Sequence, residues 1–269
     1  MAKNILIIGG GIIGLSSAYF LQKEGHQVTV IDKSDISSGA SFVNAGYITP
    51  SHIIPLASPG MIAKGIKWMF NSASPFYMQP RWDTDFFKWS WYFHKSSTAA
   101  KVEKAIPFIK DINLLSQELF EAIKKSGDLG DFQLERKGLL MLYKTQASFD
   151  HEIEIARKAS FLGLEVKELN KEELRKIEPN VKIDAAGAIH YECDGHTTPT
   201  EIMPKLLNYL KAAGVIIKTN EEVLDVAISN TKISEIRTTK DTYKADEIIL
   251  AAGSWSGILS KKINIKLLM

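Results

Sequence analysis

A glycine turn directly behind a short apolar run constrains this sequence more than any other feature. Gly9, Gly11 and Gly14 stand in GxGxxG spacing, and residues 4–8 before them are almost continuously apolar. Such a run predicts a strand covered on both faces, as in a parallel sheet. In a nucleotide-binding turn, Gly9 permits the tight turn out of the strand and Gly11 lets a pyrophosphate approach the backbone. Gly14 lets the following helix lie close to the strands.

The residues after the turn complete a βαβ unit. Residues 12–24 are rich in helix-forming residues, and the helix would begin at Ile12 and Ile13, whose free N–H groups attract phosphate. A second strand is predicted at 27–31 and ends at Asp32. The carboxylate of Asp32 can accept hydrogen bonds from ribose hydroxyls, and it disfavours a 2′-phosphate and hence NADP. The pattern predicts a dinucleotide site but leaves NAD and FAD open.

The composition is that of an ordinary globular protein, with 45% hydrophobic and 24% charged residues. The 33 basic and 31 acidic residues leave a formal charge of +2 without long runs of like charge, so we expect no nucleic-acid partner. The single cysteine, Cys193, fits a reducing cytoplasm and is expected to be inert. No apolar stretch is long enough to span a membrane. The motifs HExxH, CxxC and GxSxG are absent, and no metal site is predicted.

Beyond Asp32 the sequence carries motifs of a known family. It reads Lys33-Ser34, then ASFVNAG over residues 40–46, and continues through ASPG at 57–60 to IKW at 66–68. This segment resembles the FAD-dependent D-amino acid dehydrogenases of the small-subunit type, within the wider family of glycine and D-amino acid oxidases. The resemblance implies that the cofactor is FAD and that the segment wraps its pyrophosphate and ribityl chain. The cofactor-binding residues expected in this stretch are Lys33, Ser41, Asn44, Ala45 and Gly46.

The resemblance returns towards the C-terminal end. In the family, the passage DGHTTP (here 194–199) leads from the substrate domain back to the cofactor domain, and it is interpreted here as a turn before a helix at 202–210. By family analogy the backbone of Val223 contacts the adenine ring. A strand predicted at 246–251 ends where the family has an ATG-like motif, from which this chain departs by lacking the threonine. The cofactor contacts expected there are Ala251, Ala252, Gly253 and Trp255.

The expected fold is α/β: a Rossmann-like FAD-binding domain with a parallel sheet, split by an inserted α+β substrate domain with an antiparallel sheet. Residues 1–60 and 187–269 would form the FAD-binding domain, and residues 61–186 the substrate domain. Within the insertion, periodicity predicts helices at 106–125 and 149–162 and a strand at 138–143. The first helix is predicted from apolar residues at helical spacing, and a capping box would open a further helix. The residues concerned are Ile112, Leu115, Leu119 and Ile123 for the spacing, and Asn170 and Glu173 for the box.

Two groups of side chains in the sequence have both a structural and a functional interpretation. Seven aromatic residues gather between Trp82 and Phe93, with charged residues among them. Core packing is preferred, because aromatic residues dominate ordinary cores, and peripheral contact with a membrane or a quinone is the alternative. His52 and His196 are candidate acid–base groups, but histidines are common at turns and neither is predicted to be essential.

The resemblance implies oxidation of the CH–NH group of a D-amino acid. Hydride would pass from the substrate Cα to flavin N5, and the imino acid formed would be hydrolysed to a 2-oxo acid and ammonia. No side-chain base is needed if the amine arrives neutral, so no catalytic residue is assigned. Electrons would pass to a quinone or another acceptor, with the protein in the cytoplasm or peripherally on the inner face of the membrane.

Two alternatives remain. The first is a glycine- or sarcosine-type secondary amine oxidase that uses oxygen, and the second is a flavin-binding fragment without activity. Family members continue beyond the point that corresponds to Met269, so the chain is expected to be truncated at its C-terminus. By resemblance, the arginine that binds the substrate carboxylate lies in that further part.

Overall fold

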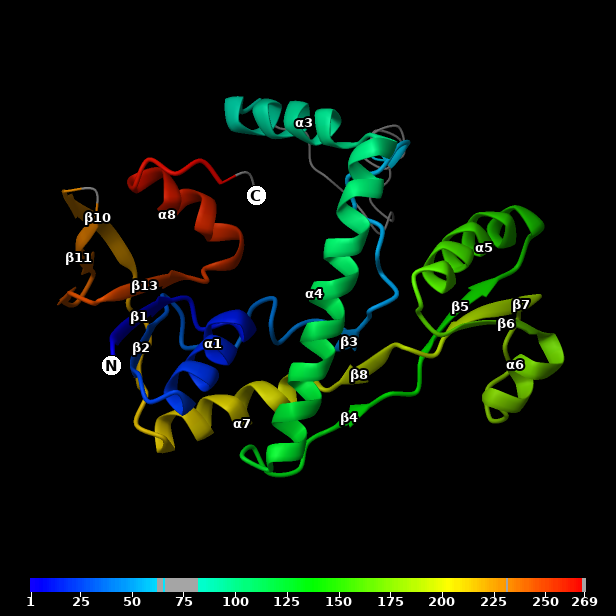
Figure 1. Ribbon diagram of the computed structural model, residues 1–269, viewed down its shortest axis with the longest axis horizontal. Helices are drawn as coiled ribbons and strands as arrows, with labels where there is room; N and C mark the ends of the chain where they lie inside the picture. Colours follow the sequence, from blue (N-terminus) through cyan, green and yellow to red (C-terminus); the bar gives the residue numbers. More distant parts are fainter. Residues whose placement is uncertain (62–64, 66–81, 231, 268–269) are drawn as a thin grey trace. The chain divides into compact units, whose positions relative to one another are not determined.

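The chain divides into two compact units, each with sheets of its own (Figure 1). The structure is a computed structural model and describes residues 1–61, 65, 82–230 and 232–267. Unit 1 comprises residues 1–46, 123–133 and 197–269, and unit 2 comprises residues 47–122 and 134–196. Parallel and antiparallel sheets are separate, which confirms the expected fold class. The domain boundaries at 60 and 187 stay a prediction, and the motif at 66–68 lies outside the described residues.

Unit 1 is built on a parallel sheet in the order β13-β1-β2-β9. Its strands are β1 (Asn4–Ile8), β2 (Gln27–Ile31), β9 (Ile216–Lys218) and β13 (Glu247–Leu250). The apolar run of β1 is explained by burial on both faces: Ile7 contacts the start of α1 (Ile12–Lys23), while Leu6 and Ile8 join a core cluster with Val223. The rings of Tyr19 in α1 and Tyr209 in α7 (Pro199–Ala212) lie with centroids 5.3 Å apart.

The rest of unit 1 follows α7 in the chain. An antiparallel sheet is formed by β10 (Val223–Ser229), β11 (Lys232–Thr238) and β12 (Thr242–Tyr243). After β13, a short 3₁₀ turn η1 (Gly253–Trp255) leads into α8 (Ser256–Lys262). The strands and helices predicted for this unit are confirmed, with ends that differ by up to three residues.

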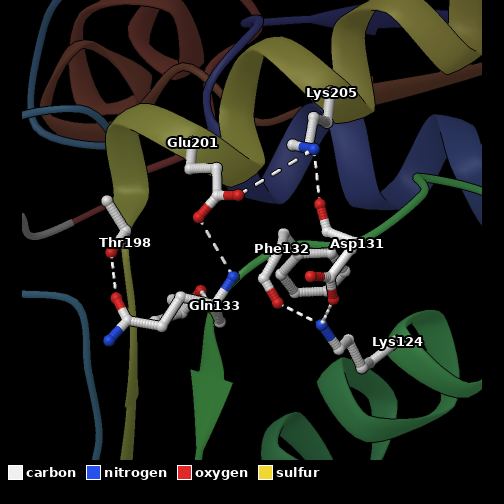
Figure 2. Close-up of polar contacts among 8 residues, drawn as sticks. Lys124, Asp131, Phe132, Gln133, Thr198, Glu201 and Lys205 are labelled. Atoms are coloured by element: carbon white, nitrogen blue, oxygen red, sulfur yellow. Dashed lines mark hydrogen bonds and ion pairs between the residues drawn. The ribbon is translucent and has the colours of Figure 1, made fainter.

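Polar contacts bind the 123–133 segment to the N-terminal part of α7 (Figure 2). The backbone N–H of Gln133 donates to the Glu201 carboxylate at 3.0 Å, and its carbonyl accepts from the Thr197 hydroxyl at 2.5 Å. Lys205 lies 3.9 Å from Glu201 and also donates to the Asp131 carbonyl. These bonds explain why a segment far from α7 in the sequence belongs to the same unit.

Unit 2 contains two antiparallel sheets and the helices around them. One sheet has the order β5-β7-β6, with β5 (Leu139–Tyr143), β6 (Val166–Asn170) and β7 (Gly187–Tyr191). The other has the order β3-β8-β4, with β3 (Tyr47–Ile48), β4 (Leu134–Glu135) and β8 (Gly195–Thr197). The helices are α3 (Thr84–Ser96), α4 (Ala99–Ser126), α5 (Gln146–Phe161) and α6 (Lys171–Ile177). A buried cluster that includes Ile53, Ala159 and Ile189 joins α5 to β7.

Local signals in unit 2 are confirmed. The capping box at the start of α6 has both of its bonds, because Asn170 accepts from the Glu173 N–H at 3.0 Å and Glu173 accepts from the Asn170 N–H at 2.9 Å. The predicted helices and strand correspond to α4, α5 and β5. Helix α4 starts earlier than predicted and continues through Pro107.

Two expectations that depend on long-range packing are wrong. The passage 194–199 is not simply a turn, because Gly195–Thr197 pairs with β3, and a Cβ on Gly195 would lie 2.6 Å from the Glu135 carbonyl oxygen. The spacing that predicted α4 does not mark its covered face, since Ile112 is 65% exposed while Val102, Ile106, Gln117 and Ile123 are buried. None of the residues of α3 is buried, so the aromatic segment is not a core element.

Candidate nucleotide-binding site

The glycine turn between β1 and α1 is formed by close backbone contacts. Gly9 has φ of 115°, and a Cβ there would lie 2.3 Å from the Ala251 carbonyl oxygen at the end of β13. A Cβ on Gly14 would lie 1.8 Å from the Gly9 carbonyl oxygen. Both positions exclude side chains because the strand ends and the helix touch there. These two glycines therefore serve the fold, and they place the N-terminus of α1 above the carboxyl end of the sheet.

Gly11 differs from the other two glycines because its missing side chain leaves space. Its backbone is ordinary, with φ of −74° and ψ of −177°, and a Cβ there would meet only the Ser41 hydroxyl, at 3.0 Å, among the described residues. The same hydroxyl accepts a hydrogen bond from the Ile12 N–H at 2.9 Å. The other first-turn N–H groups, including that of Ile13, have no partner inside the helix. A small polar cradle therefore lies at the positive end of α1.

Asp32, at the end of β2, ties the glycine turn to the loop that follows the strand. One carboxylate oxygen accepts from the Gly10 N–H at 2.6 Å, and the other accepts from the N–H and hydroxyl of Ser34, both at 2.7 Å. An ionised carboxylate has about four lone-pair sites, two on each oxygen, so the oxygen that accepts from Gly10 can still accept one further hydrogen bond. The side chain is thus positioned, and it has acceptor capacity left for a ribose.

Polar groups of the 40–46 segment form hydrogen bonds within the segment or to other residues of unit 1. The Asn44 side chain donates to the Ala40 carbonyl at 2.9 Å and accepts from the Gly46 N–H at 2.8 Å. Gly46 has φ of 70°, and a Cβ there would lie 1.8 Å from the Thr197 carbonyl oxygen. Asn44 and Gly46 therefore shape the loop, Ala45 is exposed, and Ser41 is the residue of this segment that reaches the helix.

Two further predicted residues meet beyond the carboxyl ends of β2 and β13. The ammonium of Lys33 lies 3.8 Å from the centroid of the Trp255 indole, and both side chains are exposed. Ala251 donates its N–H to the Ile8 carbonyl at 2.8 Å, which holds the Ala251-Ala252-Gly253 turn at the sheet. The Val223 side chain belongs to the core, so only its backbone is available to a ligand. The structure thus brings the glycine turn, Asp32, Ser41 and the end of β13 together in unit 1.

Sequence reasoning missed two residues that support this site. Ser34 fixes Asp32, and the signal was available, because Asp-x-Ser is the pattern of a turn in which the carboxylate accepts from the residue two places on. Glu221 is buried, donates its N–H to the Asp32 carbonyl at 2.9 Å, and accepts from the hydroxyls of Thr238 and Tyr243. The bonding partners of Glu221 lie far from it in the sequence, so no local sequence pattern predicts its role.

Of the two candidate histidines, His52 is exposed and lies at the edge of a buried polar cluster in unit 2. The carboxylate of Asp194, which is fully buried, accepts from the Ser51 hydroxyl at 2.6 Å and from the Ser51 N–H at 3.0 Å. His52 Nδ1 lies 3.2 Å from the same hydroxyl. Burial, and then the Asp194 carboxylate, raise the pKa of the Cys193 thiol to about 12, so the thiol stays neutral and unreactive. This cluster joins the 49–53 loop to the segment after β7.

The described part of the chain has neither a candidate metal site nor a helix that could span a membrane. No group of three or more histidine, cysteine or acidic side chains there is arranged to hold a metal ion. Across the same residues, no helix has the length and apolar character that crossing a membrane requires.

Comparison with known proteins shows the family of the chain. The family model DAO, described as FAD dependent oxidoreductase, matches residues 4–268. A D-amino acid dehydrogenase of Helicobacter pylori is 33% identical over all of this chain, and one of Vibrio atlanticus is 28% identical over 98% of it. In both cases this chain spans 64% of the length of the relative.

Solved structures share the fold at lower identity. The crystal structure of glycine oxidase from Geobacillus kaustophilus superposes with a TM-score of 0.72 at 22% identity, covering 99% of this chain and 59% of that one. L-proline dehydrogenase from P. horikoshii gives a TM-score of 0.65, also at 22% identity, covering 98% of this chain and 56% of that one. With the family match over almost the whole sequence, the chain belongs to the DAO family of FAD-dependent oxidoreductases.

Proposed function

We propose that this chain holds FAD at the glycine turn of unit 1 and is part of an enzyme that oxidises D-amino acids. The observation that carries the first half is the space at Gly11: a Cβ there would fill it, and it adjoins the Ser41 hydroxyl and the N-terminus of α1. A pyrophosphate needs this combination of close backbone approach, N–H donors and positive potential.

The proposed contacts follow from the position of each residue. The backbone at Gly11, the N–H group of Ile13 and the Ser41 hydroxyl, which the Ile12 N–H positions, would hold the phosphates. Asp32 would accept a hydrogen bond from a ribose hydroxyl with its remaining lone pair. The remaining predicted contacts are Gly9 and Gly14 in the turn, Lys33, Asn44, Ala45, Gly46, the Val223 backbone, Ala251, Ala252, Gly253 and Trp255.

The proposed substrate class rests on the relatives. The relatives from Helicobacter pylori and Vibrio atlanticus, at 33% and 28% identity, are named D-amino acid dehydrogenases. When bound, the flavin would supply the acceptor for the hydride that leaves the substrate Cα. The residues of unit 1 would hold the cofactor in one orientation. We assign no catalytic side chain.

The electron acceptor separates two versions of the proposal. We favour a quinone or a similar carrier, because the relatives are dehydrogenases by name. Oxygen is the alternative, and the fold shared with glycine oxidase is the observation in its favour. Both versions require an amine substrate and the same flavin site.

The test is an absorbance experiment on the purified chain, loaded with FAD and freed of excess. D-amino acids, L-amino acids, glycine and sarcosine are added anaerobically, and the bleaching of the flavin band is followed. Bleaching by D-amino acids, with recolouring by a quinone analogue rather than by oxygen, supports the proposal. Fast recolouring by oxygen favours the oxidase.

Two other outcomes contradict parts of the proposal. A chain that binds FAD stoichiometrically but is bleached by none of the amines is a binding unit without activity, and the substrate half fails. A folded chain that retains no FAD in micromolar excess overturns the flavin assignment.

A further inference from the structure

One buried carboxylate of unit 1 is not among the proposed cofactor contacts. Glu221 lies in the connection between β9 and β10, two residues before Val223, and only 3% of it is exposed. Glutamate is rarely buried, because a carboxylate removed from water loses free energy unless hydrogen bonds replace its hydration. The partners of Glu221 therefore indicate which part of the fold its burial supports.

The side chain of Glu221 is bound by the hairpin of β11 and β12. The Tyr243 hydroxyl donates to Oε1 of Glu221 at 2.8 Å, and the Thr238 hydroxyl donates to the same oxygen at 2.6 Å. Thr238 in turn accepts from the Asp241 N–H at 2.9 Å, which fixes the turn of the hairpin. Burial, and then the hydrogen bond to Glu221, raise the pKa of Tyr243 above its usual range, so its hydroxyl keeps the proton that it donates.

The backbone around Glu221 is bound to Asp32 and the loop after it. The Glu221 N–H donates to the Asp32 carbonyl, and the Asp32 N–H donates to the Lys218 carbonyl, both at 2.9 Å. The Asn220 N–H donates to the Ser34 carbonyl, also at 2.9 Å, from a left-handed conformation with φ of 51°. The connection has no regular secondary structure, so these bonds and the Glu221 side chain hold it in place.

We propose that Glu221 is a positioning residue for the adenosine half of the cofactor. Its carboxylate fixes the connection to the hairpin, and its backbone fixes Asp32, the proposed acceptor for a ribose hydroxyl. The same connection leads into β10 at Val223, whose backbone is the proposed adenine contact. A site that is ordered before the ligand arrives binds more tightly, because affinity falls with the fraction of molecules that are competent to bind. The inference rests on the proposed flavin site and adds to it a residue that acts through Asp32.

The test compares FAD with ADP, which has the adenosine and the pyrophosphate but no flavin. The cofactor-free chain is titrated with FAD by flavin fluorescence, and ADP is measured by competition, below the melting temperature of each variant. Glu221→Ala should raise the Kd of both ligands by the same factor, roughly tenfold if about a tenth of the folded molecules keep the connection ordered. Glu221→Gln keeps an acceptor oxygen for the two hydroxyls, so it should stay within about threefold of the parent chain.

Hydrogen exchange measures the same ordering without a ligand. In the cofactor-free parent chain the amides of residues 220 and 221 are bonded to the loop after β2, so they should exchange slowly. In Glu221→Ala they should exchange roughly tenfold faster, while the amides of β1 stay protected. Tyr243→Phe removes one of the two donors to the carboxylate, and it should raise both Kd values by about threefold.

Glu222→Ala is the matched control. It removes a carboxylate one residue further along the chain, where the side chain is exposed and only the backbone is bonded, to Thr239. Both Kd values and the exchange of residues 220 and 221 should equal those of the parent chain. Thermal melting of every variant checks that it folds, and Tyr243→Phe replaces Glu221→Ala in the comparison if the latter does not.

Two results overturn the proposal. One is a folded Glu221→Ala or Tyr243→Phe variant with the Kd values of the parent chain, since a lower melting temperature alone would make Glu221 a purely structural residue. The other is weaker binding of FAD with unchanged binding of ADP, which would assign the effect to the flavin half. A parent chain that binds no FAD contradicts the proposed function itself, so the two failures are distinguishable.

Discussion

Replacing Gly11 by alanine separates cofactor binding from folding. The φ of −74° suits alanine, and the added methyl would meet only the Ser41 hydroxyl, at 3.0 Å, among the described residues. A glycine-to-alanine change at a compatible position stabilises by about 0.4–1 kcal/mol through the unfolded chain. Displacing Ser41 from the Ile12 N–H costs about 1 kcal/mol. The two effects nearly cancel, so we expect the free energy of unfolding of the cofactor-free chain to change by less than about 1 kcal/mol.

FAD affinity should respond far more strongly than stability. The methyl occupies the space through which the pyrophosphate approaches the backbone, so at least one charge-assisted hydrogen bond is lost. Such a bond contributes about 1.5–3 kcal/mol. Because 1.4 kcal/mol corresponds to a factor of ten, Kd should rise roughly tenfold to a hundredfold.

The assay is a titration of the cofactor-free chain with FAD, followed by flavin fluorescence, with thermal denaturation of the same samples. Gly14→Ala is the matched control: its methyl would lie 1.8 Å from the Gly9 carbonyl oxygen, so stability and FAD affinity should fall together. If Gly11→Ala kept both the melting temperature and the Kd of the parent chain, the phosphates would not lie at Gly11. The proposed position of the pyrophosphate would then be wrong.

Three further predictions address other parts of the chain. Asp32→Asn keeps the shape of the side chain but removes the negative charge that accepts hydrogen bonds from Gly10 and Ser34. Titration with FAD should therefore give a binding free energy weaker by about 1–3 kcal/mol. An unchanged Kd would show that Asp32 is not part of the site. Asn170→Ala deletes the capping box of α6, and chemical denaturation should report a loss of about 1 kcal/mol, whereas no loss would mean that the cap contributes nothing. Because burial raises the pKa of Cys193 from 9.0 to about 12, the folded state holds that proton more tightly, and the resulting stability is present below pH 9 and lost as the pH rises towards 12. Over that range the parent chain should lose more unfolding free energy than Cys193→Ala, and an equal loss in both would contradict the assignment.

The helices and strands were predictable where the chain carries local signals. The strand, glycine turn, helix and strand at the N-terminus follow from apolar runs and glycine spacing, and they are found at β1, α1 and β2. The capping box at Asn170 involves residues only three apart, so it too could be recognised without the fold. The family motifs added the cofactor, and the match over residues 4–268 bears that out.

Contacts between distant segments could not be predicted. Ser41 reaches the Ile12 N–H across 29 residues, and Gln133 reaches Glu201 across 68. Nothing in the periodicity of α4 says which face is covered, and the apolar residue Ile112 turned out to be exposed. The aromatic content of α3 likewise suggested a core element, although none of its residues is buried. Composition gives the type of each side chain but not its neighbours in the fold.

By itself, the sequence determined the glycine turn, the acid after β2 and the starts of the helices, because these depend on backbone conformations and bonds between near neighbours. Only the tertiary structure decided that Gly9 and Gly14 serve packing while Gly11 leaves space, that Ser41 completes the cradle, and that α3 presents aromatic residues to solvent. Those properties depend on which distant atoms meet. Contacts between distant atoms depend on the burial of apolar surface over the whole fold, so no single segment of the sequence determines them.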